Sequence, residues 1–198
     1  MNNANTPALP AKKYNIIYAD PPWSYHTWSG KGKEKKSAEN HYPCMKKEEI
    51  QQLPVPDICA QDCVLFLWVT FPCLEEGLEL IKKWGFTYKT CGFTWVKKNK
   101  VADTWFTGLG YWTRANAELC LLATKGSPKR LSKAVNQVVD ARIRAHSQKP
   151  DEVRDRIVEL MGGLPRIELF ARSAAEGWDC WGNEAPDQEQ EEVEAWML

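Results

Sequence analysis

Seven consecutive apolar residues at positions 63–69 (Cys-Val-Leu-Phe-Leu-Trp-Val) constrain the fold more than any other stretch of the chain. A strand of this kind has no polar side to present to water, so it is expected to be buried on both faces. Strands buried in this way are typical of parallel sheets that carry helices above and below. The run therefore predicts an α/β protein.

Further apolar runs alternate with helical patterns along the chain. The pattern at 72–84 places Leu74, Leu78, Ile81 and Trp84 on one helix face, and Gly85 follows it, as glycine often does at a helix end. This alternation predicts a doubly wound, mostly parallel sheet with helices on both faces. The predicted strands are 15–19, 63–69, 86–96, 118–124, 135–143, 166–171 and 178–181, and the predicted helices are 46–53, 72–84 and 151–161.

The chain of 198 residues is expected to form one domain with polar segments at its two ends. We predict a flexible N-terminal arm at 1–13, the domain at 14–184 and an acidic C-terminal tail at 185–198. The 26 basic and 26 acidic residues balance, but the last fifteen residues hold six of the acids and no Lys or Arg. The rest of the chain therefore has six more bases than acids, which favours a polyanionic partner.

Several function classes are disfavoured by what the sequence lacks. No window approaches the roughly 18 apolar residues of a membrane span, and no signal segment begins the chain, so we expect an intracellular protein without a membrane partner. No Gly-x-Gly-x-x-Gly follows a predicted strand, which argues against a dinucleotide-dependent oxidoreductase. The three histidines share no spacing and the seven cysteines form no Cys-x-x-Cys pair, so we expect no metal site.

The tetrapeptide Asp20-Pro21-Pro22-Trp23 directly follows the apolar run at 15–19, at the kind of strand end where α/β sheets bind ligands. These residues suit alkylation of an amine conjugated to an aromatic ring, a poor nucleophile because its lone pair is delocalised. A carboxylate and a rigid proline carbonyl can each accept one N–H bond, which frees the lone pair, and the indole can stack on the base. The alternative is a proline-rich turn with a packed tryptophan.

Other motifs extend this pattern along most of the chain. They lie at residues 19–23, 64–70, 110–112, 118–120, 125–126, 147–152, 167–172 and 181–183. In this order they resemble the S-adenosylmethionine-dependent N6-adenine methyltransferases, the family that includes the catalytic subunit of the messenger-RNA adenosine methylation complex. The resemblance covers residues 14–184 and is strongest to small bacterial and phage members. It implies a Rossmann-like fold with the catalytic motif before the cofactor motif, and a cytoplasmic location.

The resemblance also implies one site for S-adenosylmethionine and another for adenine. Asp20, Pro21, Pro22 and Trp23 match the catalytic motif, with Asp20 also near the methionine amino group. Lys149 matches a lysine that approaches the methionine carboxylate and the substrate. The other matched residues are Glu168, Phe170, Arg172 and Asn183 toward the cofactor, with Arg172 and Asn183 at its ribose, and Tyr42 and Glu118 toward the substrate.

Substrate choice is the property that the resemblance transfers least, because the loop at 24–41 is longer and more basic here. We expect nucleic acid as the partner, DNA ahead of RNA, and self-association stays open. The alternative function is an inactive subunit that only binds nucleic acid or a partner. Enzymes that methylate glutamine or cytosine usually carry Asn or Ser in place of Asp20. The basic segments 31–36, 97–100 and 125–133 are expected to hold phosphates.

Overall fold

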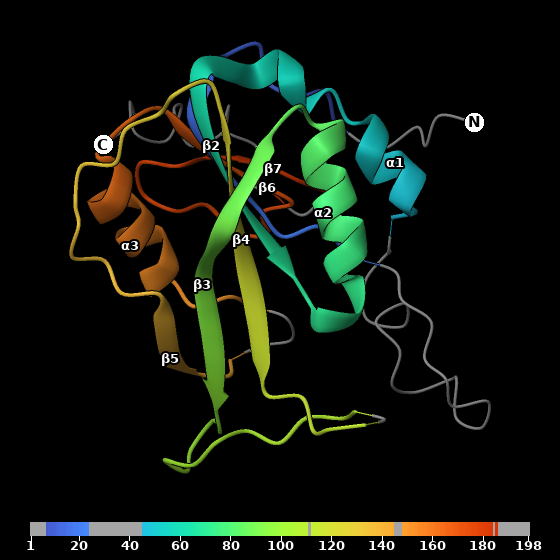
Figure 1. Cartoon of the computed structure of the whole chain (residues 1–198), viewed down its shortest axis with the longest axis vertical. Coiled ribbons are helices and arrows are strands. Elements are labelled where there is room, and N and C mark those ends of the chain that lie inside the picture. The colour runs from blue at the N-terminus through green and yellow to red at the C-terminus, as the bar shows by residue number, and fades with distance from the viewer. Residues whose placement is uncertain (1–6, 24–44, 111, 145–147, 184, 186–198) are drawn as a thin grey trace, which may run out of the picture.

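Seven strands form one sheet in the order β5-β3-β4-β2-β1-β6-β7 (Figure 1). The computed structural model describes residues 7–23, 45–110, 112–144, 148–183 and 185. The central strand β2 contains the apolar run at 63–69, and every residue of that run is buried, as predicted. The strands are β1 Tyr14–Ala19, β2 Cys59–Val69, β3 Thr87–Lys98, β4 Ala117–Lys125, β5 Val138–Arg142, β6 Arg166–Leu169 and β7 Asp179–Trp181.

The strand directions make the sheet mixed. β1 is parallel to β2 and β6, β6 is parallel to β7, and β3 is parallel to β5. β4 is antiparallel to both β2 and β3. The predicted mostly parallel sheet is thus confirmed for four of the six pairings among the described strands, and β4 is the exception. β4 reverses because residues 99–116 lead into it from β3 without a crossover helix.

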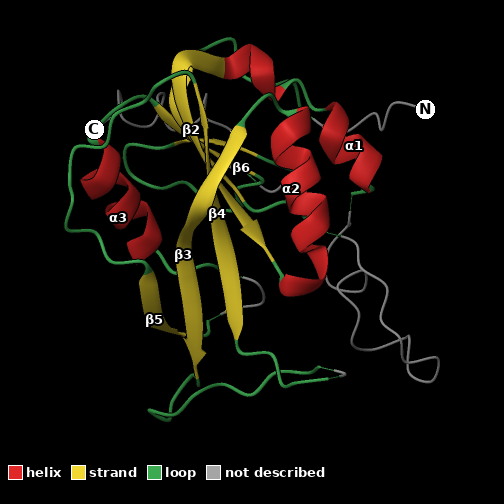
Figure 2. Cartoon of the chain, in the orientation of Figure 1, coloured by secondary structure: helices red, strands yellow, loops and turns green. Residues whose placement is uncertain are grey.

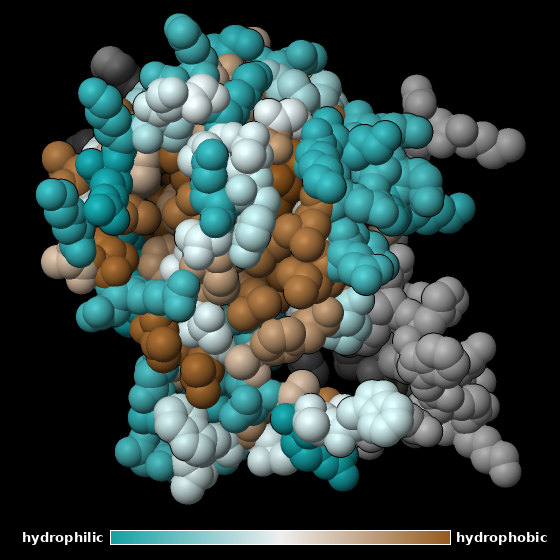
Figure 3. Space-filling view, viewed as in Figure 1, coloured by the Kyte–Doolittle hydropathy of each residue, from teal (hydrophilic) through white to brown (hydrophobic). Residues whose placement is uncertain are grey.

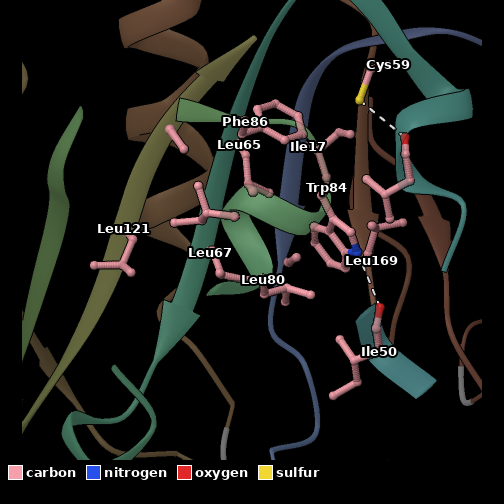
Figure 4. Close-up of a cluster of buried hydrophobic side chains, with 14 of the residues drawn as sticks. Ile17, Ile50, Cys59, Leu65, Leu67, Leu80, Trp84, Phe86, Leu121 and Leu169 are labelled. Atoms are coloured by element: carbon pink, nitrogen blue, oxygen red, sulfur yellow. Dashed lines mark hydrogen bonds between the residues drawn. The ribbon is translucent and has the colours of Figure 1, made fainter. Parts of the chain in front are cut away.

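Two helices cover one face of the sheet (Figures 1 and 2). They are α1 Lys47–Gln52 and α2 Leu74–Lys83, accompanied by the short 3-10 helices η2 Val55–Ile58 and η3 Phe71–Cys73. Leu80 packs into the buried cluster of this face, and the indole N–H of Trp84 donates to the Ile50 carbonyl oxygen at 3.3 Å (Figure 4). This hydrogen bond ties the end of α2 to α1.

The helix α3, Glu152–Met161, covers the opposite face. Its buried residues Val153 and Ile157 belong to a second cluster, which contains Tyr18 of β1 and Trp68 of β2. The Trp68 indole N–H donates to the Tyr18 hydroxyl at 2.6 Å, so this polar pair is satisfied within the core. Helices therefore lie on both faces, as the sequence predicts.

Element boundaries differ from the prediction at β2 and α2. β2 begins at Cys59, four residues before the apolar run. The hydrophobic pattern does not indicate this earlier start, because the exposed residues Gln61 and Asp62 interrupt it. α2 begins at Leu74, after the 3-10 turn that contains Pro72, and Gly85 ends it with a φ of 76°, as predicted. None of the helices in the described ranges has the length and apolar character that a bilayer crossing requires.

Candidate active site

Asp20 lies at the carboxyl end of β1, between the ends of two neighbouring strands. Its predecessor Ala19 pairs with Leu67 of β2 on one side and with Leu169 of β6 on the other. The residue after Leu169, Phe170, has a φ of 63° and is the one non-glycine residue in the described ranges with a positive φ. A bulky residue in this conformation is strained, and such strain is concentrated at functional sites. Both strand ends thus carry features of a ligand site.

The prolines shape a tight turn after Asp20. The Trp23 N–H donates to the Pro21 carbonyl at 2.8 Å, and the Met45 N–H donates to the Pro22 carbonyl at 3.3 Å. A carbonyl oxygen has two lone pairs, so each proline carbonyl keeps the capacity to accept a further bond. The two carbonyls that follow Asp20 in the chain are therefore each held by a backbone hydrogen bond and keep the capacity to accept another.

Trp23 is buried at this turn, and its indole N–H donates to the Trp68 carbonyl oxygen at 2.9 Å. It belongs to the same buried cluster as Ala19 of β1 and Leu67 of β2. This placement anchors the turn to the sheet. Stacking of Trp23 on a target base stays a prediction.

Lys149, in the segment just before α3, brings its ammonium group to Asp20. Its Nζ lies 2.6 Å from Asp20 Oδ2 and 3.3 Å from Glu118 Oε2, and it lies 5.5 Å from the centre of the Trp68 ring. The structure therefore brings together three residues, Asp20, Glu118 and Lys149, that the sequence analysis assigns to one site.

Lys97 extends this cluster by one residue that the sequence analysis assigned only to phosphate contacts. Its ammonium group forms an ion pair with Glu118 Oε1 and lies 4.9 Å from the centre of the Trp95 ring. Trp95 and Glu118 pair directly across β3 and β4. Lys97 therefore lies on the same face as Trp95 and diagonal to Glu118. Alternation along the strand indicates that Lys97 and Trp95 share a face, but it does not indicate the contact with Glu118.

Charges alternate along the cluster Lys97–Glu118–Lys149–Asp20, so that its two carboxylates balance its two ammonium groups. Burial disfavours the charged form of Lys149, but Asp20 and Glu118 outweigh this and raise the Lys149 pKa. Burial likewise opposes ionisation of Glu118, yet Lys149 and Lys97 hold its pKa below the ordinary value. The cluster thus favours a charged Lys149 and an ionised Glu118.

Asp20 is the member of this cluster that a ligand reaches most readily. Its side chain is 26% exposed, compared with 13% for Glu118 and 8% for Lys149. Burial raises the pKa of Asp20, while the charges of Lys149 and Arg172 oppose that increase. Asp20 is therefore the more accessible of the two carboxylates, and Lys149 holds it in place.

The residues expected at the cofactor lie around the ends of β6 and β7. Arg172 and Asn183 are exposed, and the bond from Ala171 N–H to the Trp181 carbonyl at 3.0 Å joins the segments that carry them. The rings of Phe170 and Trp181 meet edge to face, with their centres 5.5 Å apart. Because β6 adjoins β1, these residues follow strand ends on the same edge of the sheet as Asp20.

Glu168, also expected at the cofactor, lies within β6 and is engaged from α3. Arg154 Nε donates to Glu168 Oε2 at 2.7 Å, and both side chains are largely buried. Burial raises the pKa of Glu168, against the effect of Arg154. Tyr42, the loop at 24–41 and the tail from 186 onward lie outside the described residues. A cofactor role for Glu168 stays a prediction.

An acidic residue after the first strand, a buried counter-charge and a strained strand end are features typical of the ligand sites of α/β enzymes. The family model MT-A70 matches residues 14–184. The chain is 38% identical over 201 residues to the Type II methyltransferase M.MunI of Mycoplasma sp, a match that covers 93% of this chain and 83% of that protein.

Eukaryotic relatives match a similar part of the chain. It is 34% identical to the N(6)-adenosine-methyltransferase MT-A70-like protein of Drosophila melanogaster and 32% identical to the N(6)-adenosine-methyltransferase catalytic subunit METTL3 of Homo sapiens. Each match covers 87% of this chain but only 27% and 28% of those relatives. The chain belongs to the MT-A70 family, which confirms the resemblance and the predicted methyltransferase fold.

Proposed function

We propose that this chain transfers a methyl group from S-adenosylmethionine to the exocyclic N6 amine of adenine in nucleic acid. The observation that carries the proposal is the Asp20 carboxylate, which is accessible, held by Lys149 at 2.6 Å and followed by two rigid proline carbonyls. Membership of the MT-A70 family supports the same reaction.

The chemistry of the amine explains why these groups suit the reaction. A carboxylate has about four lone-pair sites, so Asp20 can accept an amine N–H while Oδ2 receives the bond from Lys149. With a proline carbonyl accepting the second N–H, the nitrogen becomes more pyramidal and its lone pair points at the methyl group. Asp20 also offsets the positive charge that grows on the nitrogen during transfer. Its role is to orient the amine rather than to remove a proton in advance.

The donor set fits the zwitterionic end of S-adenosylmethionine. Asp20 would accept from the amino group, Lys149 would contact the carboxylate, and Arg172 and Asn183 would contact the ribose hydroxyls. When bound, the cofactor supplies an already activated methyl group on a sulfonium, so the chain mainly aligns the reactants and excludes water.

DNA is the substrate that we favour. The match to the Type II methyltransferase M.MunI takes in most of both proteins, whereas the N(6)-adenosine-methyltransferases are matched over about a quarter of their length. The fuller match to a Type II methyltransferase therefore supports DNA, the substrate that we expect from the sequence. RNA is the alternative. Asp20 and Lys149 are both present and paired, which argues against an inactive binding subunit.

The test is to incubate the purified protein with methyl-labelled S-adenosylmethionine and oligomers of one sequence as duplex DNA, single-stranded DNA and RNA. Digestion to nucleosides should recover the label in N6-methyldeoxyadenosine. Asp20→Ala should remain folded, with a lower free energy of unfolding because Lys149 keeps only Glu118 as a partner. It should lower the transfer rate by roughly 10³-fold, because it loses the acceptor that orients the amine. The matched control is Asp57→Ala, an exposed aspartate before β2 at the opposite edge of the sheet.

Each outcome of this experiment has a defined meaning. Label in N6-methyladenosine from the RNA alone would replace DNA by RNA as the substrate. Label in another nucleobase, or no transfer to any oligomer by a protein that binds the cofactor, would overturn the proposed function. Near wild-type transfer by Asp20→Ala would remove Asp20 from the catalytic role.

A further inference from the structure

The connection between β3 and β4 extends beyond the sheet and is held by its own backbone hydrogen bonds (Figure 1). We name its described residues, 99–110 and 112–116, the β3–β4 projection. Backbone bonds continue from the strands into it: Phe106 N–H donates to the Lys97 carbonyl at 2.8 Å, and Gly108 N–H donates to the Ala115 carbonyl at 2.8 Å. A Cβ on Gly108 would lie 2.3 Å from the Ala115 carbonyl oxygen, so the two limbs approach as closely as glycine allows.

Side chains from β5 and β3 hold the base of the projection in place. Arg142 NH1 donates to the carbonyl oxygens of Val101 at 2.6 Å and Ala102 at 3.0 Å. Lys98 bridges Asp103 at 3.3 Å and Asp140 at 2.9 Å. The conformation of the projection is therefore fixed by polar contacts to the sheet and not by a core of its own.

This polar scaffold presents large apolar side chains to solvent. Four of the nine large apolar side chains that the described residues expose lie on it: Val101 (87% exposed), Trp105 (54%), Leu109 (71%) and Trp112 (92%). In Figure 3 the projection lies at the bottom of the view, where the surface is mostly white and teal. The brown, hydrophobic surface lies higher, over the sheet. Tryptophan is enriched at interaction sites, so two exposed tryptophans on one connection single it out as a candidate contact surface.

The projection begins and ends at the candidate active site. Lys97, which precedes it, forms the ion pair with Glu118, which follows it, and Lys97 N–H donates to the Asn116 carbonyl at 2.9 Å. Glu118 in turn contacts Lys149, the partner of Asp20. A molecule bound at Asp20 that extends past the edge of the sheet would therefore meet the projection.

Charge identifies the partner that this surface fits. The projection carries two exposed basic side chains, Lys100 and Arg114. Its one acidic side chain, Asp103, is already engaged by Lys98 and Arg142 of the neighbouring strands. Two copies of the chain that met here would bring like charges together, which costs free energy. A polyanion would instead neutralise them, and aromatic rings among basic residues are the pattern that binds bases by stacking.

We propose that the β3–β4 projection is a nucleic-acid contact in which Trp105 and Trp112 stack on bases beside the target adenine, an inference that rests on the function proposed above. A base that enters the active site of a methyltransferase leaves the stack of its neighbours, at a cost in free energy. Rings that cover the exposed neighbours offset part of that cost. In this arrangement Asp20 binds the target base, and the projection binds the nucleotides next to it.

The test compares Trp105→Ala/Trp112→Ala with the aromatic replacement Trp105→Phe/Trp112→Phe in the full chain. The probes are a fluorescein-labelled mixed-sequence DNA oligomer, as single strand and duplex, and the RNA of the same sequence, with binding followed by fluorescence anisotropy. The alanine variant should bind at least ~10-fold more weakly, which is about 1.4 kcal/mol, and the phenylalanine variant should keep most of the affinity. Because no charge is removed, the salt dependence of binding should keep its slope.

Controls separate this inference from the proposed function. Tyr88→Ala removes an exposed aromatic at the opposite end of β3 and should leave binding unchanged. Cofactor titration should give the same affinity in all variants. Unchanged nucleic-acid affinity in the alanine variant, with methyl transfer intact, would overturn the projection's role but not the function. Loss of a dimer in sedimentation, at unchanged affinity for the oligomers, would assign the surface to self-association instead.

Discussion

Replacing Lys149 with methionine keeps an unbranched side chain, one atom shorter, and removes the positive charge between Asp20 and Glu118. Both carboxylates then face each other in a largely buried site with only Lys97 left to balance Glu118. Removing one partner of a buried ion pair costs about 3–5 kcal/mol, because the remaining charge is left without compensation. We therefore expect Lys149→Met to lower the free energy of unfolding by about 3–5 kcal/mol at pH 7.

The pH dependence of this loss follows from the carboxylates. Without Lys149, which lowers the pKa of both Asp20 and Glu118, the two folded-state pKa values rise. A carboxyl group whose folded pKa exceeds its unfolded pKa binds more protons in the folded state, so stability falls as pH rises through that interval. The destabilisation by Lys149→Met should accordingly be largest near pH 7 and become smaller toward pH 5.

Urea unfolding followed by tryptophan fluorescence at both pH values measures the effect. The control Lys47→Met removes the lysine of the exposed pair Lys47–Glu79 and should cost less than about 1 kcal/mol. The double variant Lys149→Met/Asp20→Asn should recover part of the loss, because it removes one of the two facing charges. A cost for Lys149→Met that equals the control, or one that is the same at pH 5 and pH 7, would refute the charge-balance argument.

Two further predictions concern cofactor and substrate. Arg172→Ala and Asn183→Ala should each weaken S-adenosylmethionine binding by about 1–2 kcal/mol, and nucleic-acid binding by less, since each loses a polar contact; unchanged cofactor affinity in both variants by calorimetric titration would remove the ribose assignment. Replacing the four lysines of residues 31–36 with Ser should raise the apparent substrate constant and flatten its salt dependence, with cofactor affinity preserved; the same salt slope as wild type would assign these lysines to solubility alone.

Much of the fold follows from local pattern, and the exceptions have physical reasons. The run at 63–69 and the helical face that ends at Gly85 predict β2 and α2, because burial on both faces and amphipathic spacing leave clear marks in a sequence. The direction of β4 leaves no such mark. It depends on the path of residues 99–116 between β3 and β4. A polar connection of that length has no hydrophobic periodicity from which its path could be predicted.

The candidate site divides in a similar way. The position of Asp20 after a buried strand indicates a ligand site from pattern alone, whereas Glu118 and Lys149 enter the prediction only through the family resemblance. Nothing local links Lys149 to Asp20, since 129 residues separate them. Lys97 was missed as a partner of Glu118 because its contact is diagonal across two strands, and that register is a property of the folded sheet.

The place of β1 between β2 and β6 affects how the protein is made. β1 gains one neighbour soon after synthesis, but its other neighbour, β6, is translated near the end of the domain. At about 5–20 residues per second, the ribosome needs on the order of ten seconds to advance from Asp20 to Lys149. During that interval the Asp20 carboxylate lacks its counter-charge, and the edge of β1 that later pairs with β6 remains open. Nascent chains that stall before β6 therefore carry an open strand edge that invites aggregation.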